Sequence, residues 1–261
     1  MRNLTLIVFC LLVHVHVMAQ ELSLYQKQTY ISPAGIELPY RILYPEKYDH
    51  SKKYPLILFL HGSGERGNDN ELQLKHGAKL FITDNNRRKF PAIVIFPQCP
   101  LDGRWNIGTE DKTNTPPVLT FDYSMPPNLP LALVIELVKK LQAEGSVDIS
   151  RTYIMGLSMG GKGTFECVYR SPDLFAAAIP ICGGGDDAHY DNRVLKTSFW
   201  VLHGDQDESV GVKYSRDMVN KLKQLKANVR YTEYPGVKHN SWDNAFAEPD
   251  FLSWLFEQKR K

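Results

Sequence analysis

The sequence is poor in cysteine, and its cysteines lack the spacing of a metal site. Three of the four lie beyond the first stretch of the chain, at Cys99, Cys167 and Cys182. They form no C-x-x-C pair, which leaves zinc-finger and dithiol redox sites without support. Three cysteines allow at most one internal disulfide, and the sequence does not choose among the pairings.

An excess of charge of one sign is also absent. The chain has 31 Lys and Arg residues against 29 Asp and Glu residues, and no basic run contains interleaved aromatic residues. This composition argues against nucleic acid as a partner. His50, His76 and His189 show no spacing of metal ligands, so we expect no metal site.

No apolar run in the sequence is long enough to span a membrane as a helix. The longest, residues 4–17, falls short of the roughly 20 residues that a spanning helix needs. It follows the basic residue Arg2 and leads to the small residue Ala19, which is the arrangement of a secretory signal and its cleavage site. We expect residues 1–19 to be a signal peptide and residues 20–261 to be secreted or periplasmic, without membrane attachment after cleavage.

The composition otherwise favours one globular domain at 20–261. With 43% hydrophobic and 23% charged residues, the chain can bury one large core. Strand-like runs alternate with segments of helical periodicity, which predicts an α/β fold with a mostly parallel sheet and helices on both faces. The expected strands are an antiparallel pair, 23–31 and 36–44, followed by 55–60, 92–96, 152–155, 176–181, 198–202 and 229–234. The expected helices are 72–82, 131–141, 162–170, 214–225 and 246–256.

Residues 101–130 have no clear periodicity and are rich in proline. A long irregular stretch inside a compact domain usually has a task such as covering a site, so we expect a lid or substrate loop here. Its aromatic residues Trp105 and Tyr123 are candidates for substrate contact. A role in fastening the loop to the body of the domain has equal weight.

A serine lies in a glycine-rich corner between an expected strand and an expected helix. The motif is Gly156-Leu157-Ser158-Met159-Gly160-Gly161. Small residues around such a corner permit a strained backbone that exposes the serine hydroxyl. The pattern predicts that Ser158 is a nucleophile, although a glycine-rich loop before a helix also arises by chance.

Two later strands end in the partners that a serine nucleophile needs. The strand at 198–202 leads into His203-Gly204-Asp205-Gln206-Asp207, and the strand at 229–234 leads to His239. In an open parallel sheet, reactive residues lie beyond the carboxyl ends of the strands. An imidazole there can take the serine proton and a carboxylate can orient the imidazole. Ser158, His239 and one of the two aspartates are therefore a candidate catalytic triad.

Four sequence blocks in this order resemble a known family. They are His61-Gly62-Ser63-Gly64-Glu65-Arg66-Gly67, the motif around Ser158, the run from His203 to Asp207 with Val210, and His239-Asn240-Ser241-Trp242. From about residue 24 onward, the chain resembles α/β-hydrolase-fold serine esterases, above all the secreted group of carbohydrate esterases and polyhydroxybutyrate depolymerases. The resemblance implies an α/β-hydrolase fold and places the acid at Asp207, with Asp205 as the alternative.

The same resemblance implies the groups that would hold a developing oxyanion. They are the backbone N–H of Met159 and one N–H from the loop after Gly62, where Ser63 is the first choice and Gly64 the second. We expect His61 to maintain the geometry of that loop.

Further residues follow strands on the same expected face of the sheet. Arg66, Gln98 and Trp242 are candidates for substrate contact, with structural roles in the loops as the alternative. We expect His203, which precedes the acid, to be structural.

Together these features predict a secreted serine carboxylic-ester hydrolase that works through an acyl-enzyme and needs no cofactor. Its expected partner is an acylated carbohydrate, from which it would remove acetyl or hydroxycinnamoyl (feruloyl) groups. A peptidase or amidase of the prolyl oligopeptidase type would use the same triad, but this sequence shows no propeller. A non-catalytic binding protein on the same scaffold would lack a member of the triad or of the oxyanion loop, and none is lacking here.

Overall fold

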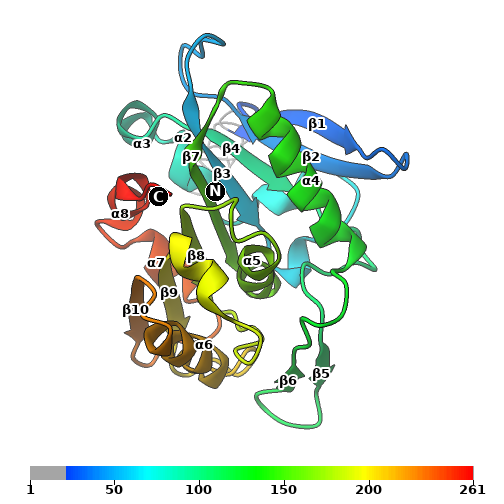
Figure 1. Cartoon of the computed structure of the whole chain (residues 1–261), viewed down its shortest axis with the longest axis vertical. Helices are drawn as coiled ribbons and strands as arrows, with labels where there is room; N and C mark the ends of the chain where they lie inside the picture. The colour runs from blue at the N-terminus through cyan, green and yellow to red at the C-terminus, as the bar shows by residue number, and fades with distance from the viewer. Residues whose placement is uncertain (1–21, 261) are drawn as a thin grey trace, which may run out of the picture.

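Six of the strands in an eight-stranded sheet run parallel to one another in the computed structural model (Figure 1). The structure describes residues 22–260, so the expected signal peptide at 1–19 lies outside the described residues. The strand order is β1-β2-β4-β3-β7-β8-β9-β10, and β1 and β2 run antiparallel to their neighbours at one edge. This mostly parallel sheet confirms the fold class expected from the sequence.

The bounds of most strands lie within a few residues of those expected, although β7 extends beyond the expected 152–155 at both ends, and the helices differ more. The strands of the sheet are β1 (Gln26–Ile31), β2 (Glu37–Leu43), β3 (Tyr54–Leu60), β4 (Ile93–Pro97), β7 (Val147–Leu157), β8 (Ala177–Ile181), β9 (Ser198–Gly204) and β10 (Val229–Tyr234). The α-helices are α2 (Ala78–Ile82), α3 (Asp84–Lys89), α4 (Leu129–Ala143), α5 (Met159–Arg170), α6 (Lys213–Gln224), α7 (Trp242–Phe246) and α8 (Phe251–Glu257).

Successive residues of the central strands face opposite sides of the sheet. In β3, Leu56, Leu58 and Leu60 belong to one buried cluster, and Ile57 and Phe59 belong to the other. Helices α4, α5 and α6 contribute to the first cluster, and α2, α7 and α8 contribute to the second. Because both faces are covered, both sets of side chains must be apolar, which explains the continuous apolar runs of the sequence.

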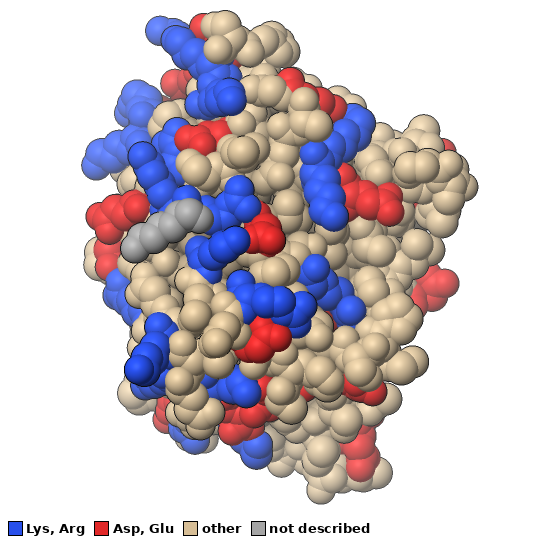
Figure 2. Space-filling model, viewed as in Figure 1, with Lys and Arg blue, Asp and Glu red and all other residues tan. Residues whose placement is uncertain are grey.

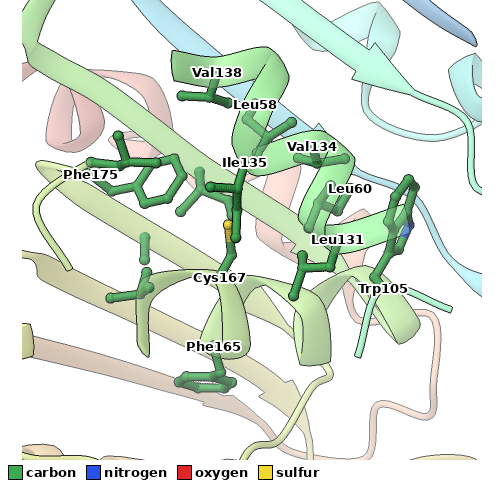
Figure 3. Packing of buried hydrophobic residues seen from close by; sticks show 14 of the residues in the cluster. Leu58, Leu60, Trp105, Leu131, Val134, Ile135, Val138, Phe165, Cys167 and Phe175 are labelled. Atoms are coloured by element: carbon green, nitrogen blue, oxygen red, sulfur yellow. The ribbon is translucent and has the colours of Figure 1, made fainter. Parts of the chain in front are cut away.

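The apolar stripe of α4 packs beside α5 (Figure 3). Leu131, Val134, Ile135 and Val138 recur at helical spacing and are buried, and they lie near Cys167 of α5 in the same cluster. Burying one large apolar side chain stabilises the fold by about 1.5–3 kcal/mol. This packing holds α4 and α5 side by side on one face of the sheet.

Two of the expected helices are interrupted in the structure. Instead of one helix at 72–82, a short 3₁₀ turn, η2 (Leu72–Leu74), is separated from α2 by Gly77, whose φ of 80° leaves the right-handed helical region. The helix expected at 246–256 is likewise split into α7 and α8. Pro249 lies in that break, where a helix interior would not accept its missing N–H and its ring.

The proline-rich segment (residues 101–130) is more ordered than the sequence suggested. It contains the antiparallel pair β5 (Thr109–Asp111) and β6 (Val118–Thr120), visible as a separate arm in Figure 1. Its last residues already belong to α4, where Pro130 occupies the first turn and needs no N–H partner.

The proline-rich segment is tied to α5 by side chains of that helix. The Lys162 ammonium donates to the Glu110 carboxylate at 2.6 Å, and the Glu166 carboxylate accepts from the Ile107 N–H at 2.6 Å. Trp105 packs against Gly163, where an added Cβ would lie 2.5 Å from the Trp105 Cβ. Helix α5, which begins at the glycine-rich corner, therefore also holds the proline-rich segment in place.

The described part of the chain gives two further findings on the sequence expectations. None of its helices is long and apolar enough to cross a membrane. Cys99, Cys167 and Cys182 are buried and free, so the disulfide that their number would allow does not form among them.

Candidate active site

The carboxyl ends of the parallel strands meet at one edge of the sheet. Leu60 of β3 is level with Gly156 of β7, and Leu157 is level with Ile181 of β8. Across the last pair, Tyr234 of β10 is level with Gly204 of β9. The loops that leave these strands carry His61, Ser158, Asp207 and His239.

Ser158 lies on a strained corner between β7 and α5. Its φ of 55° and ψ of −115° are unusual for a residue with a side chain, and its N–H donates to the Ile181 carbonyl at 3.0 Å. A Cβ on Gly160 would lie 1.9 Å from the Leu60 carbonyl oxygen, and one on Gly156 would lie 2.4 Å from the Gly160 carbonyl oxygen. Only glycine fits at both positions, which explains why the motif around Ser158 needs small residues.

Three side chains from different loops form one hydrogen-bonded chain. The Ser158 Oγ lies 2.9 Å from His239 Nε2, and His239 Nδ1 lies 2.7 Å from Asp207 Oδ2. Because a carboxylate oxygen only accepts, Nδ1 carries the proton and Nε2 is free to accept the serine proton. This is the tautomer that a general base next to serine requires. The structure thus brings together the three residues that the sequence predicted as a triad.

The two candidate acids are clearly separated by their contacts. Asp207 has a fully buried carboxylate, whose Oδ1 accepts from the N–H groups of Ser209 and Val210 at 2.8 and 2.9 Å. Asp205 instead accepts from the Gly236 N–H at 2.7 Å and stabilises the turn before His239. Asp207 is therefore the partner of the imidazole, and Asp205 shapes the loop.

His203 contacts the same oxygen of the Asp207 carboxylate as His239 does. Its Nε2 lies 3.1 Å from Asp207 Oδ2 and 2.8 Å from the Val210 carbonyl, and its Nδ1 lies 2.7 Å from Ser215 Oγ. Burial alone would raise the pKa of Asp207, but hydrogen bonds from His203 and His239 outweigh burial and hold this pKa well below its usual range. Asp207 is thus ionised in the folded protein.

His61 has the loop role that the sequence suggested. Its Nδ1–H donates to the Gly62 carbonyl at 2.6 Å, its Nε2 accepts from the Cys99 N–H at 3.0 Å, and its own carbonyl accepts from the Trp105 indole at 3.1 Å. These contacts tie the loop after β3 to the end of β4 and to the proline-rich segment. The imidazole is fully used for structure and cannot serve as a second base.

A cavity of about 420 Å³ opens beside the nucleophile. Its lining includes Ser158 and His239, together with Met159 and Ser63, the first choices for oxyanion donors. Gly64 follows Ser63 in the short turn η1 (Ser63–Glu65) and is not among the lining residues. The remaining lining is mostly charged and consists of Arg66, Arg104, Asn106, Glu110, Lys112, Pro117, Lys162, Glu208, Ser209 and Val210.

Two residues expected to contact substrate do not reach this cavity. Gln98 is fully buried, and its amide accepts from the Asn70 N–H at 2.7 Å and donates to Asp69 at 2.8 Å. Trp105 is also fully buried, between His61 and Gly163. Both predictions of substrate contact were wrong for the same reason. Each side chain is buried and holds a neighbouring loop in place, so it does not face the cavity.

The other sequence candidates are divided between the cavity and its surroundings. Arg66 lines the cavity, as expected for a substrate contact. Trp242 does not line it but packs edge-on against the His239 ring at 5.4 Å, so it can hold the imidazole in place. Tyr123 is buried against Tyr169 and fastens the proline-rich segment to the body of the domain.

Several lining residues were missed by the sequence reasoning. Arg104, Glu110 and Lys112 lie in the proline-rich segment, for which the sequence predicted substrate contact by aromatic residues. Lys162 lies one turn after Ser158 on α5 and was assigned only to a helix. A signal for the first three was present, because a segment already expected to face the site contains charged residues of both signs.

Two groups of side chains in the described chain have ligand atoms within 4.8 Å of one another, the distance range of a metal site. Cys182 lies beside Asp207 and His239, whose polar atoms already serve the triad. The second group contains His189, which the sequence spacing did not link to any ligand. Its Nδ1 lies 2.7 Å from Asp186 Oδ2, which also accepts from the Tyr123 N–H at 2.8 Å. This contact anchors the proline-rich segment.

Comparison with known proteins agrees with this geometry. The Esterase family model, described as "Putative esterase", matches residues 34–242. The chain is 25% identical over 180 residues to "Probable feruloyl esterase C" of Aspergillus terreus, a match that covers 69% of this chain and 58% of that protein.

Solved structures show the same architecture. A thermostable esterase matches with a TM-score of 0.83 and 38% identity, over 92% of this chain and 64% of that one. A ferulic acid esterase from Anaeromyces mucronatus, solved with ferulic acid, matches with a TM-score of 0.63 and 17% identity over 90% of each chain. The chain spans roughly three fifths of the length of the Aspergillus terreus protein and of the thermostable esterase.

The assignment of the acid predicts a sharp difference between two neighbouring aspartates. In Asp207→Asn the amide cannot hold His239 in the required tautomer, so the rate at which a fluorophosphonate probe labels Ser158 should fall by about 10³- to 10⁴-fold. Asp205→Asn is the matched control and should label at nearly the wild-type rate, because this side chain contacts only the turn. Equal losses in the two variants would contradict the assignment.

The burial of His61 predicts a loss of stability on the acid side of neutrality. Burial lowers the pKa of His61 from 6.5 to about 4. The unfolded chain therefore binds more protons between these values, so the stabilisation is complete above pH 6.5 and is lost as the pH falls towards 4, by about 3 kcal/mol. Asp207, whose pKa is lowered further, contributes only at still lower pH.

Urea unfolding at several pH values between 7 and 4 measures this effect. The His61→Asn variant should lose much of the slope of unfolding free energy against pH, whatever its stability at pH 7. His50→Asn removes an exposed histidine and should keep the wild-type slope. If His61→Asn also keeps it, His61 is not the group responsible.

Proposed function

Because the chain belongs to this esterase family, we propose that it is a secreted serine carboxylic-ester hydrolase that works through an acyl-enzyme. The observation that carries the proposal is the hydrogen-bonded chain from Ser158 through His239 to Asp207. A serine hydroxyl is a weak nucleophile at neutral pH, and this arrangement supplies both the base and the group that orients the base. No step of the proposed reaction needs a cofactor.

In the proposed first half-reaction, Ser158 Oγ attacks the ester carbonyl while His239 Nε2 takes the serine proton. Asp207 stabilises the imidazolium that forms. The oxyanion is held by the backbone N–H of Met159 and that of Ser63, and each donor typically contributes about 3 kcal/mol to the transition state. The imidazolium then protonates the leaving alcohol, which departs and leaves the acyl group on Ser158.

In the second half-reaction, water attacks the acyl-enzyme. His239 takes a proton from this water and returns it to Ser158 Oγ as the acid product leaves. Ser158 and His239 are partly exposed, whereas the Asp207 carboxylate is fully buried. This difference in exposure leaves the reacting atoms of Ser158 and His239 open to substrate and water, while the Asp207 carboxylate stays in a fixed environment.

The proposed substrates are acylated carbohydrates, from which the enzyme would remove acetyl or hydroxycinnamoyl groups. Similarity to proteins named as feruloyl or ferulic acid esterases supports the class. Of the two acyl groups, the cavity favours acetyl, because no Phe, Tyr or Trp of the described chain lines it. A polar lining also suits the hydroxyl-rich alcohol of a carbohydrate ester.

Nucleic acid is not a proposed partner. On the face of the molecule shown in Figure 2, acidic side chains lie among the basic ones. This interspersed charge agrees with the near balance of 31 basic and 29 acidic residues in the sequence.

Export is the second part of the proposal, and it rests on Arg2, the apolar run at 4–17 and Ala19. We expect cleavage after Ala19. N-terminal sequencing of protein recovered outside the cytoplasm should then begin at Gln20. A protein that keeps residues 1–19, or that stays in the cytoplasm, would contradict this part without affecting the chemistry at Ser158.

A panel of esters and an amide tests the activity. The wild type should hydrolyse p-nitrophenyl acetate and acetylated xylan faster than methyl ferulate, and all three faster than an aminoacyl nitroanilide. Ser158→Ala should lower kcat by on the order of 10⁵ or more, because the covalent step is lost. Turnover of only the anilide would favour a peptidase, and hydrolysis that survives Ser158→Ala would rule out the acyl-enzyme.

A further inference from the structure

Positive charge is concentrated in the cavity beside Ser158. Four basic side chains line it, Arg66, Arg104, Lys112 and Lys162, against two acidic ones, Glu110 and Glu208. The whole sequence is nearly balanced in charge, so the excess is local. Charges of one sign that line a cleft with low-dielectric walls raise the local concentration of ligands of the opposite sign.

Most of the negative charge of Glu110 is already used within the protein. Its carboxylate accepts from the Lys162 ammonium at 2.6 Å, and the Lys162 side chain is only 6% exposed. Burial alone would raise the pKa of Glu110, but this hydrogen bond and the charges of Lys162, Arg104 and Lys112 lower it. Glu110 is therefore ionised and paired with the one buried cation of the group.

The three other basic side chains have no hydrogen-bonded carboxylate of their own among the described residues, and two of them share Glu110 with Lys162 as longer ion pairs. Arg104 and Lys112 lie 3.7 and 3.9 Å from Glu110, beyond hydrogen-bond distance. Arg66 donates to the carbonyls of Ser63 and Gly103, at 3.0 and 3.3 Å, and forms no ion pair with any residue in the described chain. These two carbonyls orient the guanidinium beside the oxyanion loop while its charge remains unneutralised.

We propose that Arg66, Arg104 and Lys112 form a subsite for a carboxylate of the substrate, so that esters with an acidic group near the scissile carbonyl are preferred. This inference rests on the proposed ester hydrolysis at Ser158. A carboxylate matches the planar donor geometry of a guanidinium and forms charge-assisted hydrogen bonds with it. A sugar acid would supply the carboxylate on the alcohol side of the ester, and a dicarboxylic half-ester would supply it on the acyl side.

The test compares charged and neutral esters of similar shape. On the alcohol side the pair is 4-acetoxybenzoate and 4-acetoxybenzamide, and on the acyl side it is mono(p-nitrophenyl) succinate and p-nitrophenyl butyrate. The quantity measured is the ratio of kcat/KM for the charged ester to that for the neutral ester, so a general loss of activity cancels. The double variant Arg66→Gln, Arg104→Gln should lower this ratio by at least about tenfold, as expected for lost charge-assisted hydrogen bonds. The ester pair that shows the fall identifies the side that carries the acid.

Two further variants separate the subsite from a general effect of charge. Lys140→Gln removes one positive charge from the exposed surface of α4, outside the cavity, and should leave the ratio unchanged. Glu208→Gln removes an acidic group from the cavity and should raise the ratio. A ratio that falls equally in Lys140→Gln and in the double variant would overturn the subsite.

A second measurement does not depend on ester turnover. Succinate should slow the labelling of wild-type Ser158 by a fluorophosphonate more than succinamide does, and the difference should shrink in the double variant. If Ser158 is not labelled at all, the proposed function fails. If Ser158 is labelled but succinate protects no better than succinamide, the nucleophile stands and the carboxylate subsite is wrong.

Discussion

The close backbone contact between the start of α5 and strand β3 is the constraint on which the site depends. Gly160 approaches the Leu60 carbonyl so closely that a Cβ would lie 1.9 Å from the oxygen. This approach sets the angle at which α5 leaves β7, and the sharp turn holds Ser158 at a φ of 55°. The strained serine therefore stays in place because the sheet and the helix are both packed in apolar clusters around it.

A single line of hydrogen bonds then joins loops that are distant in the sequence. From Ser158 it passes through His239 and Asp207 to His203, and from there to the Ser215 hydroxyl on α6. Ser215 also donates to the Gly183 carbonyl after β8, at 3.0 Å. Because a fully partnered polar network in a buried place favours one arrangement, the orientation of the base is determined well beyond the three residues that react.

The proline-rich segment divides its side chains between two tasks. Its aromatic residues Trp105 and Tyr123 are buried and attach it to the body of the domain, whereas Arg104, Glu110 and Lys112 line the cavity. An aromatic side chain removes a large apolar area from water when it is buried. A charged side chain is costly to bury unless it is paired. This balance favours attachment of the segment by its rings, and it leaves Arg104, Glu110 and Lys112, not the aromatic residues, at the cavity.

The sequence by itself determined the sheet, the nucleophile and the base. Continuous apolar runs report strands buried on both faces, and Ser158 and His239 follow directly from where such strands end. The resemblance already favoured Asp207 as the acid, and the tertiary structure excluded the alternative, Asp205. Only the tertiary structure broke two expected helices, buried Gln98 and Trp105, and paired Glu110 with Lys162, which is 52 residues away. The physical reason is that local patterns record which face of an element is buried, whereas the direction of a loop side chain depends on contacts with segments far along the chain.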